Sequence, residues 1–189
     1  MSEQVSRRSF VQLSAGAAVS LIPGITLAQQ VLPVQNAGPV EAPFERDYAA
    51  PDFKPGWKKQ QLNRLQVQDF VIYAHSDFDM VKKLLDKEPK LIAATMDWGG
   101  GDWESGLNGA SHMGRKDIVN YLLEKGARID IFCAAMMGQL EAVKAFLTLQ
   151  PLLIDAKGPH GISLHMHAKR GGAEAVKVYG YLQSIKSVG

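Results

Sequence analysis

The sequence predicts an all-α protein, a stack of about four helix-turn-helix repeats with short β-like fingers between them. Three observations predict this class: a motif that recurs four times, glycines at fixed places within it, and apolar residues at helical spacing. A chain of 189 residues with 46% hydrophobic and 21% charged side chains can form one domain with its own core. We expect that domain at residues 58–186.

Charge and cysteine content exclude several classes of function. The 21 basic and 19 acidic residues give a net charge of +2, which provides no general excess for binding nucleic acid. The single cysteine, Cys133, excludes an intramolecular disulfide framework and a cysteine-based zinc site. We therefore expect a fold held together by packing, and a chain without a nucleic-acid partner.

Residues 1–28 have the features of an export signal. The basic pair Arg7-Arg8 precedes an uncharged stretch at residues 13–28, which ends in small residues. This stretch is shorter than the roughly 20 apolar residues that cross a bilayer, so we expect no stable membrane insertion. Residues 29–57 contain five of the nine prolines and are expected to form an extended linker.

The motif Ser-Arg-Arg-Ser-Phe at residues 6–10 resembles the bacterial twin-arginine (Tat) export signal, although Val11 and Gln12 depart from its pattern. The resemblance implies that the Tat translocase recognises Arg7 and Arg8 and exports the folded chain. It also implies cleavage near Ala28 and a periplasmic or otherwise exported location.

A fourfold repeat occupies the rest of the chain. Each copy is anchored on a valine that is followed by paired apolar residues: Val81, Val119, Val143 and Val176. A glycine precedes three of the anchors by five residues: Gly114, Gly138 and Gly171. The valine and the apolar pair form one stripe of a second helix, and the glycine permits a tight turn before it.

The motif resembles the ankyrin repeat over about residues 66–183. The copy at residues 105–127 reads Ser-Gly-Leu-Asn-Gly-Ala-Ser-His-Met-Gly-Arg-Lys-Asp-Ile-Val-Asn-Tyr-Leu-Leu-Glu-Lys-Gly-Ala. The spacing of the anchors leaves no room for a finger between the second and third copies, and it lengthens the finger around residues 96–104. The combination of this repeat spacing, the leader and the Asp-Trp-Gly-Gly-Gly-Asp segment at 97–102 resembles exported bacterial ankyrin-repeat proteins without an assigned activity.

We expect an exported protein-protein interaction module without enzymatic activity or a cofactor, because repeat stacks leave a long concave face open. We expect the positions six and seven residues before each anchor to be exposed, which in the first copy are Ala74 and His75. The expected contacts with a protein or peptide partner are the finger tryptophans and these positions in the other three copies: Trp98, Trp103, His112, Met113, Met136, Met137, Lys169 and Arg170. Two alternatives remain open, that the methionines pack between neighbouring helices and that the tryptophans cover the edge of the stack.

The sequence does not predict a metal site. His160, His165 and His167 lie close in sequence, but helix positions two apart do not share a face, and zinc needs three or four ligands. An alternative function is soft-metal binding, with methionine, cysteine and histidine side chains holding Cu(I), or a role as accessory subunit of an exported enzyme. No Ser/His/Asp or Cys/His arrangement indicates catalysis.

Overall fold

The computed structural model describes residues 41–53, 56 and 59–188. The predicted export signal, with Arg7 and Arg8, lies outside these residues. Within them, no helix is long and apolar enough to cross a membrane.

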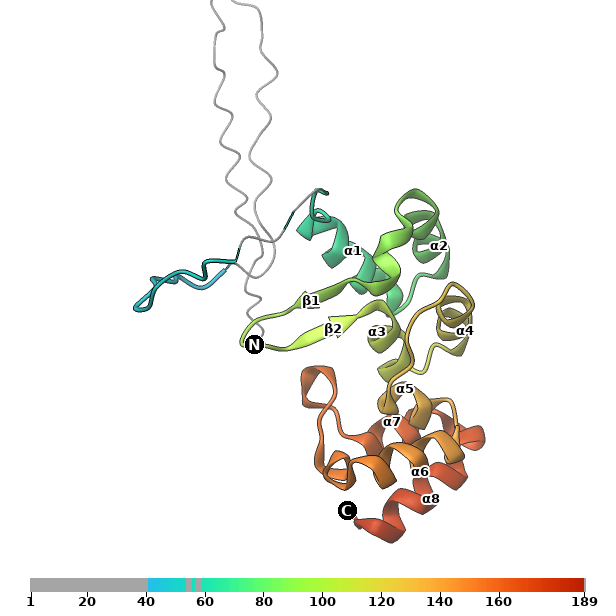
Figure 1. Ribbon diagram of the computed structural model, residues 1–189. Helices are drawn as coiled ribbons and strands as arrows, with labels where there is room; N and C mark the ends of the chain where they lie inside the picture. Colours follow the sequence, from blue (N-terminus) through green and yellow to red (C-terminus); the bar gives the residue numbers. More distant parts are fainter. Residues whose placement is uncertain (1–40, 54–55, 57–58, 189) are drawn as a thin grey trace, which may run out of the picture. The chain divides into compact units, whose positions relative to one another are not determined.

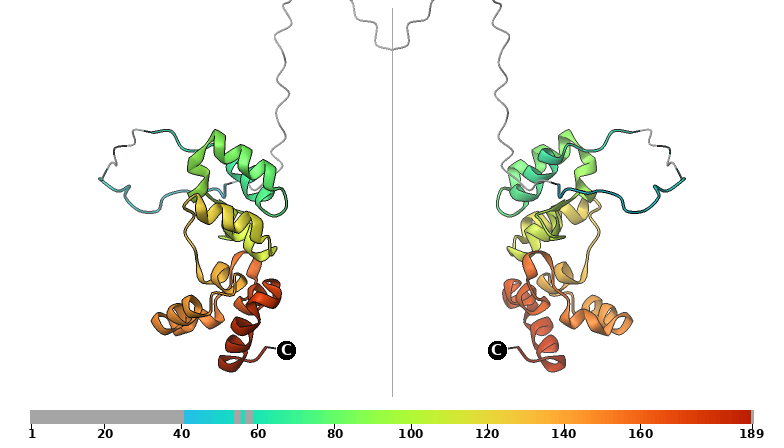
Figure 2. Two further views of the ribbon diagram at one scale, coloured as in Figure 1. Left: turned by 90° about the vertical axis from the view of Figure 1, so that its right-hand side faces the viewer. Right: turned by 90° about the vertical axis from the view of Figure 1, so that its left-hand side faces the viewer.

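The described part of the chain is mostly helical, which confirms the predicted class in its coarse form (Figure 1). Eight α-helices form four consecutive pairs in these residues: α1 (Arg64–Ala74) with α2 (Phe78–Lys87), α3 (Gly106–His112) with α4 (Lys116–Glu124), α5 (Ile131–Met136) with α6 (Leu140–Leu149), and α7 (Leu164–Arg170) with α8 (Val176–Ile185). The first helices contact one another in chain order, α1 with α3, α3 with α5, and α5 with α7. Two further views show the pairs following each other in that order (Figure 2).

The turn glycines serve two different purposes. Gly114 and Gly138 have φ angles of +73° and +72°, which favour glycine, as the sequence predicts for a tight turn. Gly171 has a φ of −66° and needs no such freedom. A Cβ on Gly171 would instead overlap the carbonyl of Met136, so this glycine allows α7 to approach α5 closely.

Three of the four valine anchors are confirmed as core residues. Val81, Val119 and Val143 have no exposed surface. Val176 is 64% exposed, so the prediction fails in the fourth copy. There a 3-10 turn, η4 (Gly172–Ala175), precedes α8, and Val178 takes the buried position two residues later.

Two projecting segments connect the helix pairs. The hairpin, residues 95–105, follows the 3-10 turn η1 (Pro89–Ala93) and pairs β1 (Thr95–Asp97) antiparallel with β2 (Trp103–Ser105). Its turn is made by three glycines with positive φ, Gly99, Gly100 and Gly101. The finger, residues 157–163, lies between η2 (Pro151–Asp155) and α7, contains η3 (Pro159–Gly161), and is closed by a bridge between Lys157 and Ser163. No strand occurs between α4 and α5, as the anchor spacing predicts.

Candidate metal centre

The hairpin carries one carboxylate into the interior of the protein. Side chains alternate between the two faces of a strand, so neighbours on β2 point in opposite directions. Trp103 is 59% exposed, and the side chain of the next residue, Glu104, has no exposed surface. A buried carboxylate is costly unless charged or hydrogen-bonding partners surround it.

Three imidazoles surround this carboxylate. The Nε2 atom of His112 lies 2.8 Å from Oε1 of Glu104, and Nε2 of His75 lies 3.5 Å from the same oxygen. The Nε2 atom of His160 lies 3.4 Å from Oε2 of Glu104. All four donor atoms lie within 4.8 Å of one another. They come from the end of α1, from β2, from α3 and from the finger.

Oxygen acceptors orient two of the three rings. The Nδ1 atom of His75 lies 2.8 Å from the Val71 carbonyl, which only accepts, so Nδ1 carries the proton and donates. In the same way, Nδ1 of His160 donates to Asp102 at 2.7 Å. Both rings therefore direct Nε2 at the centre. Histidines that bind metal ions are usually oriented by such a hydrogen bond on the other nitrogen.

The local backbone is shaped around these rings. Among the described residues, His160 is the one non-glycine residue with a positive φ, +58°. Strain of this kind persists where surrounding contacts hold it and is concentrated at functional sites. Gly109 lies against His75, because a Cβ there would be 2.8 Å from Cε1 of the ring. The close approach of α3 to His75 therefore depends on a glycine.

The electrostatics favour a positive charge at the centre. Burial alone would raise the pKa of Glu104, but the hydrogen bonds from His112, His75 and Trp98 outweigh it and lower this pKa to about 2. The hydrogen bond to Glu104 raises the pKa of His75, against the opposing effect of burial. The Nε2 atoms of His75 and His112 lie 3.1 Å apart and both contact Oε1 of Glu104, so these three atoms are close enough together to bind one cation.

The spacing of the four donors suits a metal ion. Bonds of 2.0–2.2 Å to a tetrahedral zinc ion place two ligand atoms roughly 3.3 Å apart. The distances of 2.8, 3.1, 3.4 and 3.5 Å between the donors bracket that value. The donors of His75, His112 and Glu104 therefore already have the spacing of ligands to one ion, and His160 adds a fourth donor within 4.8 Å of the others.

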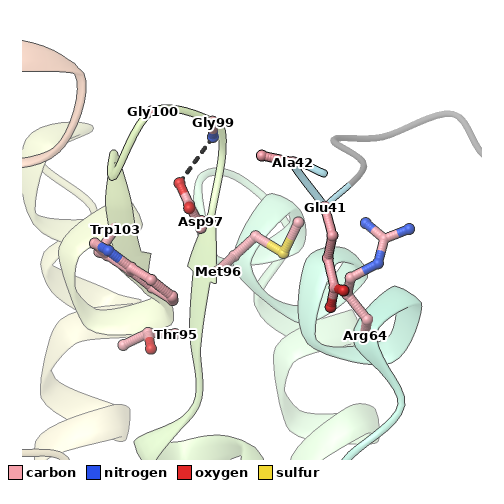
Figure 3. Close-up of a pocket in the computed structure, with 9 residues that line it drawn as sticks. All are labelled: Glu41, Ala42, Arg64, Thr95, Met96, Asp97, Gly99, Gly100 and Trp103. Atoms are coloured by element: carbon pink, nitrogen blue, oxygen red, sulfur yellow. Dashed lines mark hydrogen bonds between the residues drawn. The ribbon is translucent and has the colours of Figure 1, made fainter. Parts of the chain in front are cut away.

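The two finger tryptophans lie in different environments. The indole N–H of Trp98 donates to Oε2 of Glu104 at 2.8 Å, which makes Trp98 part of the centre. Trp103 faces solvent and lines hollows of about 510 Å³ and about 340 Å³. Figure 3 shows the larger hollow, where Asp97 is directed at the glycine turn and the side chain of Met96 extends toward the segment of Glu41 and Ala42. Trp103 remains a candidate for partner contact.

The remaining predicted contact residues divide by exposure. Met113 is 45% exposed, Lys169 and Arg170 are exposed, and Met137 is half-buried. The predictions that Ala74 and Met136 are exposed are wrong, because both are fully buried. Met136 follows the alternative of packing between neighbouring first helices, since α5 packs between α3 and α7.

His112 is a further correction to the predicted groove. Its side chain is only 7% exposed, because it turns toward Glu104 rather than outward. Of the sulfur side chains that the Cu(I) alternative uses, Met136 and Cys133 are fully buried, whereas Met113 is 45% exposed and Met137 is half-buried. Burial raises the pKa of the Cys133 thiol to about 11, which opposes formation of the thiolate that binds metal ions.

Sequence reasoning did not bring these four residues together. The repeat register places His75 and His112 at neighbouring positions of two copies, which is the one signal that could have joined them. Glu104 and His160 come from two different projecting segments. His165 and His167 lie elsewhere, with His165 bound to the carbonyl of Lys186 and His167 to that of Ser163.

Comparison with known proteins gives no relative from which to infer a function. No family model matches the chain, and no curated protein matches it closely. The proposals below therefore rest on the chemistry of the site.

Proposed function

We propose that this protein binds one divalent transition-metal ion through His75, Glu104, His112 and His160. The observation that carries the proposal is the convergence of three imidazole Nε2 atoms on one fully buried carboxylate. Acceptors behind His75 and His160 and the indole donor behind Glu104 support it, because they hold the donor atoms in place before an ion binds.

The donor set favours particular ions. Imidazole nitrogen suits zinc, copper, nickel and iron in their divalent states, whereas calcium and magnesium prefer shells of oxygen atoms. Cu(I) prefers sulfur ligands, which are absent from the four donors. Zinc is the simplest occupant, since it accepts three nitrogens and one carboxylate oxygen in a tetrahedron.

Calorimetric titration of the metal-stripped chain with Zn²⁺ tests this proposal. We expect binding of one ion, and no comparable binding of Mg²⁺. Glu104→Gln should weaken binding at least as much as loss of an outer-shell partner, roughly 10–100-fold. Glu141→Gln is the matched control, because this exposed carboxylate pairs with Lys144 on α6. Equal Zn²⁺ affinity in both variants would refute the proposal.

We further propose that the domain is an ankyrin-type repeat array that is exported by the twin-arginine route. The four helix pairs, the contacts between successive first helices and the positive φ of Gly114 and Gly138 support the first part. The leader motif supports the second part. Replacement of Arg7 and Arg8 by lysines should trap the precursor inside the cell, and normal export of that variant would refute the assignment.

A second candidate function is binding of a protein or peptide partner at the hairpin. One observation favours it, a tryptophan that is 59% exposed and lines two hollows. Exposed aromatic side chains are frequent anchors of interfaces. Capture of a periplasmic partner by the wild-type chain and not by Trp103→Ala would support this function. Equal capture by both would exclude Trp103 as an anchor.

A further inference from the structure

The four donors of the metal centre differ in their access to solvent. The side chains of Glu104 and His112 are 0% and 7% exposed. Those of His75 and His160 are 24% and 38% exposed. His75 and His160 therefore mark the side of the cluster that faces solvent, whereas Glu104 and His112 lie on its buried side. A purely structural zinc site is usually enclosed by its four protein ligands.

The donors also differ in how closely they are grouped. His75, Glu104 and His112 form a compact set, with donor distances of 2.8, 3.1 and 3.5 Å. Two histidines and one carboxylate of this kind bind one face of an ion and leave positions open opposite them. The ion is then held from the buried side of the site.

His160 stands apart from this set. It comes from the finger, and its ring and backbone N–H are held by Asp102 rather than by the other donors. Its Nε2 atom lies 3.4 Å from Oε2 of Glu104, and its ring packs edge-on against His112 with centroids 5.4 Å apart. His160 is therefore the fourth and most exposed donor of the centre, and it borders the side that faces solvent.

We propose that the bound ion keeps a coordination position between His75 and His160 that accepts a small monoanion of the carboxylate class. This inference rests on the proposed metal binding. A divalent ion with Glu104 and three neutral imidazoles has a net charge of +1, which favours one more negative ligand. The carboxylate of Asp102 is engaged by His160 and does not fill that position.

Azide titration of the Co²⁺-loaded full chain tests the proposal, with visible absorption as the readout. We expect a saturable change in the Co²⁺ spectrum, and acetate should compete with azide for the position. An intense tetrahedral spectrum that azide leaves unchanged would mean a closed site and overturn the proposal. If no Co²⁺ spectrum forms at all, the proposed metal binding itself fails, and the two failures are thereby distinguished.

A variant locates the open position. His160→Gly removes the exposed donor, and glycine adopts a φ of +58° without strain. We expect the variant to keep Co²⁺ on the three remaining donors and to saturate at a lower azide concentration than wild type. An unchanged azide affinity would place the position away from His160. Complete loss of Co²⁺ would show that His160 closes the site, and either result would overturn the assignment.

Discussion

Asp102 holds His160 with both oxygens of its carboxylate. One oxygen accepts the backbone N–H of His160 at 2.8 Å, and the other accepts Nδ1–H at 2.7 Å. The two residues lie 58 positions apart, on the hairpin and on the finger. This pair fixes the ring whose Nε2 faces Glu104, and it ties the two projecting segments together at the metal centre.

Asp102→Asn should weaken Zn²⁺ binding, because the two N–H groups of His160 bind two different carboxylate oxygens, and asparagine replaces one of them with an NH2 group that only donates. Loss of an outer-shell partner typically costs roughly 10–100-fold in metal affinity. Competition with a chelator of known affinity measures this change. Asp155→Asn is the control, since that exposed carboxylate pairs with Lys186 in another part of the fold. Equal affinities for the two variants would contradict a positioning role for Asp102.

Gly109→Ala should destabilise the protein and displace His75. The added Cβ would lie 2.8 Å from the imidazole Cε1 and 2.9 Å from Nδ1, and overpacking of this kind costs about 1–3 kcal/mol. Gly180→Ala is a matched control, because apart from the neighbouring backbone of α8 no atom lies within 4 Å of its Cβ position. There alanine should stabilise the helix by up to about 1 kcal/mol. Urea unfolding measures the change in stability that each variant causes. Two changes of the same sign would contradict the packing argument.

Replacement of Trp98 and of Trp103 by phenylalanine should change the stability of the protein by different amounts. Trp98→Phe removes the indole donor from the buried Glu104 carboxylate, which should cost about 1–3 kcal/mol in the free energy of unfolding. Trp103→Phe alters an exposed ring, and surface substitutions usually change stability by less than about 0.5 kcal/mol. Chemical denaturation of both variants compares them. A loss at Trp103 that matches the loss at Trp98 would show that Trp103 also supports the fold.

Acidification should destabilise the protein through His167. Burial lowers the pKa of His167 below its ordinary 6.5, and the nearby charge of His112 adds to this, whereas the Ser163 carbonyl and Asp130 oppose it. The unfolded chain therefore takes up the proton first, and stability falls as the pH drops below about 6.5, by at most about 1.4 kcal/mol per pH unit.

His167→Asn isolates this effect, because asparagine does not titrate. Urea unfolding of metal-free protein at pH 7.5 and pH 5.5 should show a smaller loss of stability in the variant than in wild type. The other histidines titrate in both proteins, so their contribution cancels in the comparison. Equal losses would mean that burial does not lower the pKa of His167 enough to affect folding.

The helical part of the fold could be predicted from the sequence because it is local. Val81, Val119 and Val143 recur with a fixed motif, and each occupies a buried position of a second helix. Val176 broke this rule, since an additional 3-10 turn before α8 shifts the buried face to Val178. A pattern of residue types does not encode such a shift.

The metal centre could be predicted only in part. The repeat register brings His75 and His112 together, since both lie shortly before an anchor on successive first helices. Glu104 faces inward because side chains alternate between the two faces of β2. Which of them face inward depends on the residue at which the strand begins. His160 reaches the site through a left-handed backbone and a bond to Asp102. These last contacts join distant segments, so they become visible only when the chain is folded.

Anomalous diffraction at the zinc edge from crystals of the zinc-loaded protein tests the central claim most directly. We predict one strong peak within about 2.0–2.2 Å of Nε2 of His75, His112 and His160 and of a Glu104 oxygen. No peak at these four residues, or a peak only at other side chains such as His165, would contradict the proposed metal centre.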